Sequence, residues 1–277
     1  MSEGLTRAES GVIEFDGGTL AWESAGEGPG VVFLHPGLWD GRVWDEQFGV
    51  FSRTYRVLRF DFRGYGHSSR PEPGRAYSHV DDLAAVMDAA RIERAALVGC
   101  SMGGSTAIDF ALVHPSRVWA LVLAGSGLNA FDDRLTPQEE AELERLSAPV
   151  AEAMEAGDIE RAERARLRIW APLGTEDEAG RRIREIAFDN IHEMTMDESG
   201  RRDISPPAIE RLEQIKAPTL VLPADKDPLV YRRLSAILAE RIPDARLVQI
   251  PETDHVVNMR RPDEFDRVVL GFLDEVL

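Results

Sequence analysis

Ser101 has the sequence surroundings of a reactive serine. It stands in the stretch LVGCSMGGST, after an apolar run, with Gly99 two residues before it and Gly103 two residues after it. A strand ending at Gly99 and a helix beginning after Ser101 must be joined by a very short turn, which strains the serine backbone and lifts its hydroxyl clear of the sheet. Glycine lets strand and helix approach without a Cβ clash. Because the same pattern also forms ordinary strand-to-helix turns with a serine cap, the assignment depends on partners elsewhere in the chain.

A serine hydroxyl is a weak nucleophile at neutral pH, so it needs a base and a carboxylate that orients the base. The expected chain order after the serine is acid, then histidine. Asp225 and Asp227 follow the apolar run of LVLPADKDPLV, and His255 follows that of LVQIPETDHVV. Both runs predict strands of a parallel sheet. In such sheets the functional sites lie at the carboxyl ends of the strands, where these residues would meet. We select Asp227 because it lies past the strand in the loop, whereas Asp225 starts the turn; Asp254 and Glu252 are alternative orienting groups.

An oxyanion that forms beside a serine needs two hydrogen-bond donors. The backbone N–H of Met102, directly after the serine, is the first candidate. The second must come from the loop after the run VVFL, where Pro36 has no N–H, so that Gly37 or, as the alternative, Leu38 would donate. We interpret His35 in the same loop as a structural residue that ties the loop down.

Strand and helix patterns alternate around these residues. Apolar runs bounded by turn residues predict strands at 11–17, 19–25, 31–35, 55–61, 95–99, 118–125, 217–225 and 245–251. Helical spacing is predicted at 43–53, 78–90, 101–114, 229–241 and 262–276. Strands joined by crossover helices imply an α/β fold, a mostly parallel sheet with helices on both faces.

The alternation stops between about residues 128 and 215. That stretch is rich in charge, lacks a strand pattern and predicts helices at 137–156, 158–170, 176–194 and 206–215. We therefore expect a core domain made of residues 1–127 and 216–277, with residues 128–215 inserted as a helical lid. The apolar face of these helices must be buried, and we expect part of it to cover the pocket over Ser101.

Composition excludes several classes of protein. The 277 residues are 43% hydrophobic and 29% charged, and the net charge of −17 argues against nucleic acid as a partner. No apolar run approaches the length of a membrane span, and the opening MSEGLTRAES lacks the core of a signal peptide. The single Cys100 rules out an internal disulfide, so we expect a cytoplasmic protein. As a separate expectation, the protein is a monomer or a homodimer. The six histidines lack metal-ligand spacing, and we expect no metal and no organic cofactor.

Taken together, these residues resemble the α/β-hydrolase superfamily over essentially the whole chain. The matching stretches are HPG at 35–37, DFRGYGHS at 61–68 and GCSMGG at 99–104, together with Asp227 and His255. The resemblance implies an eight-stranded sheet with a helical lid between strands six and seven. It also implies that Asp61, Arg63 and His67 are scaffold residues.

Within the superfamily the chain is most similar to small cofactor-free bacterial esterases, enol-lactonases and carbon–carbon bond hydrolases. The nucleophile is serine rather than the aspartate of haloalkane dehalogenases and epoxide hydrolases, which disfavours those two reactions. Relatives usually have glycine before the catalytic histidine, where this chain has Asp254. Carbon–carbon hydrolases often have an aromatic residue after it, where this chain has Val256 and Val257, which weighs against that branch.

The sequence thus predicts a serine hydrolase that cleaves an ester, thioester or lactone of a small, largely apolar molecule. The alternatives are hydrolysis of a carbon–carbon bond in a vinylogous diketone, acyl transfer, and a ligand receptor on the same fold with residual hydrolysis. Specificity would come from the lid and from the loop after His35. The candidate substrate-binding residues are Leu38, Trp39, Leu128, Trp170, Met194 and Val256, each of which could equally be packing. Arg168 is a further candidate, as a partner for a substrate carboxylate.

Overall fold

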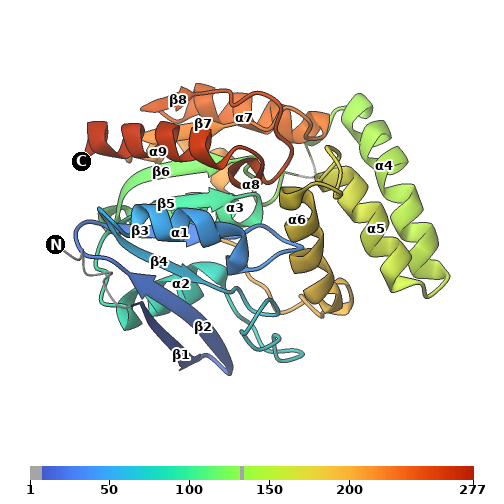
Figure 1. Ribbon diagram of the computed structural model, residues 1–277, viewed down its shortest axis with the longest axis horizontal. Helices are drawn as coiled ribbons and strands as arrows, with labels where there is room; N and C mark the ends of the chain where they lie inside the picture. The colour runs from blue at the N-terminus through green and yellow to red at the C-terminus, as the bar shows by residue number, and fades with distance from the viewer. Residues whose placement is uncertain (1–7, 132–133) are drawn as a thin grey trace.

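The computed structural model describes residues 8–131 and 134–277, and in them an eight-stranded sheet runs through the molecule (Figure 1). The strands lie in the order β1-β2-β4-β3-β5-β6-β7-β8. β1 pairs antiparallel with β2 and β2 with β4, and the other neighbouring pairs are parallel. The strand bounds are β1 Glu9–Phe15, β2 Gly18–Ala25, β3 Gly30–Leu34, β4 Arg56–Phe60, β5 Ala95–Cys100, β6 Val118–Ala124, β7 Thr219–Leu222 and β8 Ala245–Leu247. The predicted α/β class with a mostly parallel eight-stranded sheet is confirmed.

Helices cover both faces of the sheet, which explains why β3, β5 and β6 are continuous apolar runs buried along their whole length. Alternate residues of β3 point to opposite faces: Val31 and Phe33 pack into one core cluster, and Val32 and Leu34 pack into the other. The first cluster lies under α1 (Asp45–Phe51), α8 (Val257–Arg260) and α9 (Pro262–Val276). The second lies under α2 (His79–Ala89), α3 (Met102–Val113) and α7 (Leu229–Arg241). Two short 3₁₀ helices, η1 (Gly41–Trp44) and η2 (Pro115–Arg117), complete these layers.

Between β6 and β7 the chain leaves the sheet and forms a helical insertion. Figure 1 shows its three α-helices gathered at the right-hand end of the sheet, opposite the C-terminus. They are α4 (Pro137–Glu155), α5 (Ile159–Trp170) and α6 (Glu178–Asp189), and the 3₁₀ helices η4 (Ile191–Thr195), η5 (Ala208–Glu210) and η6 (Leu212–Gln214) follow.

Each of these α-helices begins at a capping side chain. Thr136 and Glu139 form a reciprocal capping box at the start of α4. Asp158 accepts a hydrogen bond from a backbone N–H at the start of α5, and Asp177 does the same for α6. Because a cap satisfies backbone donors that a helix end leaves free, these local signals fix where the helices start.

Two of the predicted helical segments differ from the structure. The prediction of a helix over 206–215 is wrong: Pro206 and Pro207 supply no backbone N–H, and only η5 and η6 form there. The predicted helix over 176–194 is interrupted at Asn190. Its side-chain amide donates to Asp40 and its amide oxygen accepts from the backbone N–H of Gly66, so the chain turns there and continues as η4.

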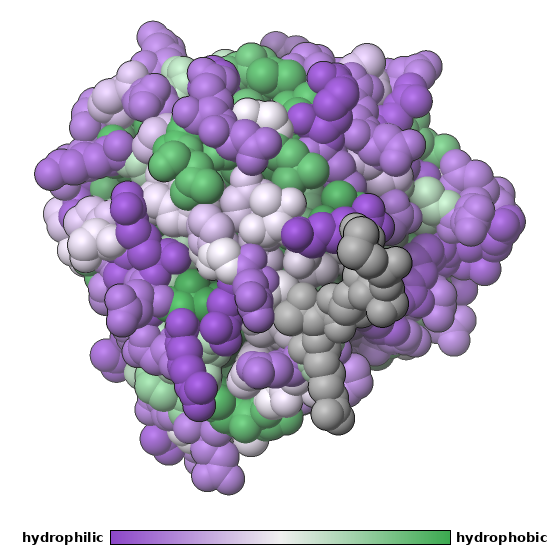
Figure 2. All heavy atoms as spheres, turned by 60° about the vertical axis from the view of Figure 1, so that its left-hand side comes forward, coloured by the Kyte–Doolittle hydropathy of each residue, from purple (hydrophilic) through white to green (hydrophobic). Residues whose placement is uncertain are grey.

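In the part of the chain that the structure describes, no helix has the length and apolar character needed to cross a bilayer. The face in Figure 2 is mostly hydrophilic, and its hydrophobic side chains lie in separate groups. Separate groups of this kind are usual on protein surfaces.

Candidate active site

Ser101 is the single residue between β5 and α3. Its backbone dihedral angles are φ 51° and ψ −114°, which residues other than glycine rarely adopt. The strand and the helix approach so closely that a Cβ atom on Gly99 would lie 2.4 Å from the carbonyl oxygen of Gly103. A Cβ atom on Gly103 would lie 2.1 Å from the carbonyl oxygen of Leu34 in β3. The two glycines are therefore sterically required for the turn that presents Ser101.

His255 and Asp227 form a buried pair at the same edge of the sheet. Nδ1 of His255 lies 2.9 Å from Oδ1 and 3.0 Å from Oδ2 of Asp227, and both side chains are almost fully buried. Gly125, at the end of β6, leaves room for the pair, because a Cβ atom there would lie 3.0 Å from Asp227 and 3.3 Å from the His255 ring. This contact orients the imidazole and leaves its Nε2 on the side away from the carboxylate.

The other carboxylates considered from the sequence have partners elsewhere. Asp225 accepts hydrogen bonds from the Gln249 amide and from the backbone N–H of Glu252 (2.7 Å), which ties together the loops after β7 and β8. Asp254 is paired with Arg260 at 2.8 Å. The side chain of Glu252 contacts Arg261. Among these carboxylates, Asp227 is the one that the structure places against His255.

The loop of His255 is connected directly to the strand that carries Ser101. The thiol of Cys100, the last residue of β5, donates to the backbone carbonyl of His255 at 3.2 Å. Burial raises the pKa of this thiol well above its usual value, which keeps it protonated as a donor. The structure therefore brings the end of β5, Asp227 and His255 together.

The loop after β3 is fixed by His35, as the sequence predicts. Nε2 of His35 accepts the backbone N–H of Phe62 at 2.9 Å, and Nδ1 lies 2.8 Å from the carbonyl oxygen of Pro36. Burial lowers the pKa of this histidine, which agrees with the neutral ring that accepting a hydrogen bond requires. Gly37 follows, half-buried, with the Tyr65 hydroxyl 3.7 Å from where its Cβ would be. Leu38 is buried and has a φ of 70°.

The stretch 61–68 holds this region together through side chains. Asp61 accepts the backbone N–H groups of Gly41 at 2.9 Å and His67 at 2.8 Å. Arg63 forms a buried ion pair with Asp82 at 2.7 Å. These contacts join the loops after β3 and β4 and the start of α2.

Trp170, the last residue of α5, packs directly on His255. The two ring centroids are 4.5 Å apart, and the backbone N–H of His255 donates to the Trp170 carbonyl at 3.3 Å. Tyr231 of α7 completes the cluster, with its ring 5.1 Å from Trp170 and 5.4 Å from His255. Sequence reasoning missed Tyr231; its place four residues after Asp227, in the first turn of a helix, is the signal that could have found it.

The other predicted substrate-binding residues lie in different surroundings. Leu38 and Val256 are buried in the core cluster under α1 and α9, and Leu128 is buried in the opposite cluster. Met194 is half-buried in η4. Trp39 is fully buried, and its indole N–H donates to the carbonyl of Ile183 in α6 at 2.8 Å. Of the six predicted residues, Trp170 is therefore the one in contact with the His255 ring.

A charged cluster occupies the same face of α5 as Trp170. Glu163 and Arg166 lie seven and four residues before Trp170, which places all three on one side of the helix. Arg166 is 3.4 Å from Glu163 and also contacts Glu193 of η4. Neither carboxylate oxygen of Glu163 accepts a hydrogen bond within the described residues, and burial raises the pKa of this carboxyl to about 7. Sequence analysis had no signal for this cluster among the many charges of the insertion.

Comparison with known proteins identifies the family. The sequence profile described as alpha/beta hydrolase fold matches residues 30–262, which is most of the chain. The chain belongs to the α/β-hydrolase family.

Individual relatives within this family have different reactions in their names. RutD of Azorhizobium caulinodans, which bears the name of a carbamate hydrolase, is 30% identical over 275 residues and covers 94% of this chain and 92% of its own. A 2-hydroxy-6-oxo-6-phenylhexa-2,4-dienoate hydrolase of Comamonas testosteroni is 30% identical over 270 residues, covering 92% of this chain and 91% of its own. The solved structure of Est816, described as an N-acyl homoserine lactone degrading enzyme, has a TM-score of 0.71 and 29% identity, and covers 95% and 100% of the two chains. This α/β hydrolase is thus similar to hydrolases whose names refer to the cleavage of different types of bond.

Proposed function

We propose that this α/β hydrolase is a serine hydrolase that cleaves an ester, thioester or lactone of a small, largely apolar molecule through an acyl-enzyme. The observation that carries the proposal is the buried pair of Asp227 and His255, 2.9 Å apart and joined by a hydrogen bond from Cys100 to the strand that ends directly before Ser101. Two relatives and a lactone-degrading neighbour that cover most of the chain have hydrolytic reactions in their names.

In the proposed reaction the Ser101 hydroxyl attacks the substrate carbonyl while Nε2 of His255 takes its proton. Asp227 holds Nδ1 of the ring and stabilises the imidazolium that forms. The backbone N–H groups of Met102 and Gly37 bind the oxyanion; donors of this kind are typically worth about 2.7–4 kcal/mol each. His255 then protonates the leaving group, and a water molecule activated by His255 attacks the acyl carbonyl and releases Ser101.

In this proposal residues 128–215 act as a lid on a core formed by 1–127 and 216–277. The contact between the Trp170 and His255 rings and the hydrogen bond between their backbones support that role, because the end of α5 lies against the proposed base. A cover at this position excludes water and contacts the acyl or leaving group.

Hydrolysis of a carbon–carbon bond is the second candidate. The dienoate hydrolase of Comamonas testosteroni favours it through 30% identity over 92% of this chain. The residues after His255 are Val256 and Val257 in this chain, where the carbon–carbon branch often has an aromatic residue.

Labelling combined with a substrate panel tests both candidates. A fluorophosphonate should modify Ser101 of the purified protein and should fail to modify Ser101→Ala. The unlabelled protein is then assayed on p-nitrophenyl esters, lactones and dienoic ketones. Turnover of esters or lactones supports the first candidate, and turnover of the ketones alone supports the second. Labelling at another residue contradicts the assignment of the nucleophile.

A further inference from the structure

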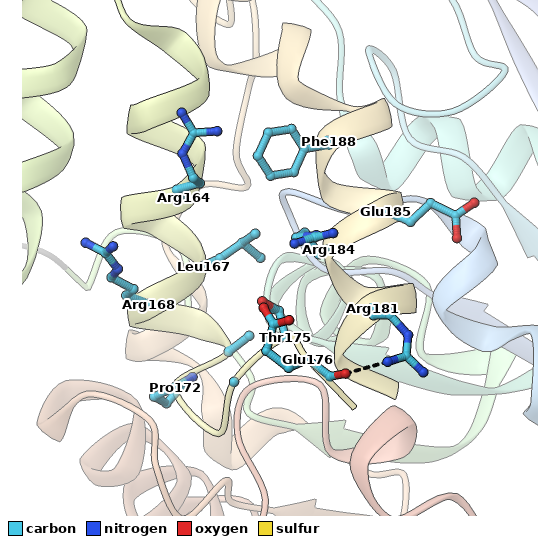
Figure 3. Close-up of a pocket in the computed structure, with 12 residues that line it drawn as sticks. Arg164, Leu167, Arg168, Pro172, Thr175, Glu176, Arg181, Arg184, Glu185 and Phe188 are labelled. Atoms are coloured by element: carbon cyan, nitrogen blue, oxygen red, sulfur yellow. Dashed lines mark hydrogen bonds between the residues drawn. The ribbon is translucent and has the colours of Figure 1, made fainter. Parts of the chain in front are cut away.

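A groove in the helical insertion is separate from the proposed catalytic residues. It lies between α5 and α6, has a volume of about 760 Å³ and is drawn in Figure 3. Pockets that hold small ligands typically have volumes of roughly 300–1,000 Å³. Ser101, Asp227 and His255 are not among the residues that line it. The groove therefore has the size of a ligand site and a lining of its own.

Four arginines give the groove a positive lining. Figure 3 shows Arg164 and Arg168 on α5, and Arg181 and Arg184 on the facing helix α6. The lining also contains two glutamates, so arginines outnumber carboxylates by four to two in a protein whose net charge is −17. A local excess of positive charge on so acidic a chain favours an anion at this place.

Part of this charge is already compensated. Arg164 pairs with Glu160 at 3.2 Å on an exposed surface, and Arg181 donates to the backbone carbonyl of Glu176 at 2.6 Å. Glu185, one of the two lining glutamates, is held by Arg182 at 3.0 Å. Contacts of this kind between exposed groups contribute little to stability, and they leave the guanidinium groups accessible to a ligand.

Arg168 and Arg184 are different. Neither has an ion pair or a hydrogen bond with any residue in 8–131 or 134–277, and both are exposed. Guanidinium groups bind carboxylates through paired, charge-assisted hydrogen bonds. Two such groups, one on each of the helices that line the groove, are available to bind an anionic head at its mouth.

The groove also has an apolar part. Leu167 of α5 and Ala171, the residue directly after α5, line it and are buried in the core cluster that continues to the sheet. The half-buried ring of Phe188 lies across from them on α6. A ligand that fits this lining combines one anionic group with a hydrocarbon body of several carbons.

We propose that the groove between α5 and α6 binds an amphiphilic organic carboxylate, with Arg168 and Arg184 as the partners of the carboxylate and the hydrocarbon body against Leu167, Ala171 and Phe188. The site is distinct from the proposed catalytic residues.

The groove is joined to the loop of His255. Its rim residue Gly174 accepts a hydrogen bond from Arg260 at 2.7 Å, and the neighbouring Leu173 donates to Asp254 at 3.3 Å. Trp170, which lies in the sequence between the lining residues Leu167 and Ala171, packs against the ring of His255. A ligand in the groove should therefore change the rate of hydrolysis. This effect on the rate rests on the proposed function, whereas the binding of the ligand does not.

Calorimetric titration of the purified full chain with sodium hexanoate tests the binding. The double variant Arg168→Gln/Arg184→Gln should bind hexanoate about tenfold more weakly or worse, since it removes both partnerless guanidinium groups. Arg145→Gln/Arg161→Gln is the matched control: it makes the same change in net charge at exposed positions of α4 and α5 outside the lining, and it should bind as the wild type does. For the wild-type protein, affinity should fall from hexanoate to acetate, fall in 1 M salt, and be lost with 1-hexanol.

Several results would overturn the proposal. Absence of hexanoate binding to the wild type, equal binding of 1-hexanol, or equal loss in the two double variants would each do so. Loss of binding after fluorophosphonate labelling of Ser101 would place hexanoate in the proposed catalytic site instead. The wild-type salt and chain-length series keeps the test decisive if the groove variant does not fold, and binding that persists in a protein without hydrolytic activity would contradict the proposed function alone.

Discussion

The edge of the sheet and the helical insertion are built in different ways. At the sheet edge, backbone contacts fix the positions: β5 and α3 touch where Gly99 and Gly103 leave no room for a Cβ atom, and Asp227 and His255 are buried against Gly125. In the insertion, capped helices rich in exposed charge are held by side-chain contacts. The comparison teaches that the sheet fixes the positions of the proposed catalytic groups, whereas the insertion offers surfaces that can change without moving those groups.

The attachments of the insertion sharpen this contrast. Besides Trp170 on His255, α6 is bound to the loop after β3 through the hydrogen bond from Trp39 to the Ile183 carbonyl and through an ion pair between Arg42 and Asp189 at 2.8 Å. That loop also carries Gly37, the proposed oxyanion donor. The insertion is thus attached at the two places where it can influence the proposed chemistry.

The largest expected effect is at the sheet edge. Ser101→Ala should lower kcat by about 10⁴-fold or more, because the nucleophile is lost and oxyanion binding alone remains. Steady-state kinetics on the best ester or lactone measures this. The melting temperature should stay close to that of the wild type, since alanine fits beside the two glycines. Near-normal turnover would remove Ser101 from the mechanism.

The two aspartates after β7 provide the next test. Asp227→Asn should cost several orders of magnitude in kcat, because His255 loses its orienting charge and its correct tautomer. Asp225→Asn is the matched control, and it should cost about tenfold or less, because Asp225 contacts Gln249 and the Glu252 backbone rather than His255. A reversed order of the two effects would assign the orienting role to Asp225.

In the helical insertion, the corresponding test concerns the effect of Glu163 on folding stability. The pKa of Glu163 is raised from 4.5 to about 7 by burial, so the unfolded chain loses this proton at lower pH than the folded protein does. Folding stability is therefore lost as pH rises from about 4.5 to 7, and the two pKa values limit the cost to about 3 kcal/mol.

Glu163→Gln removes the charge and should raise the free energy of unfolding at pH 8 by up to about 3 kcal/mol, while changing it little near pH 4. Urea denaturation at the two pH values measures the difference. Glu160→Gln, an exposed position on the same helix paired with Arg164, should change stability by a few tenths of a kcal/mol at most. An equal response of the two variants would mean that Glu163 ionises in the folded protein as freely as a surface group.

The same contrast explains what sequence alone could predict. The sheet, the turn at Ser101 and the pairing of Asp227 with His255 follow from strand runs, glycine spacing and chain order, which are local signals. Tyr231 was missed because its contacts with Trp170 and His255 join α5, α7 and the loop after β8, although its place four residues after Asp227 was a usable signal. Glu163 was missed because its burial beside Arg166 arises from packing within the insertion, which no local pattern encodes. The predicted helix over 206–215 failed because two adjacent prolines outweighed the helical spacing that follows them.

The smallest expected effect is the one that decides whether the insertion selects the substrate. Trp170→Ala removes a ring that packs on His255 and Tyr231, and it should change the ratio of kcat/KM between short and long acyl chains by more than tenfold, about 1.4 kcal/mol. The matched control is Ile169→Ala, a half-buried neighbour on another face of α5, which should leave that ratio unchanged. Kinetics on a series of p-nitrophenyl esters measures the ratio, and the pH dependence of kcat/KM monitors His255 in the same samples. A loss that is uniform across the series would mean that Trp170 only braces His255, and then the insertion would belong with the sheet edge as part of the fixed machinery. A change in the ratio at constant pH profile assigns to Trp170 a contact with the acyl group itself, because the base is unaltered while the preference shifts.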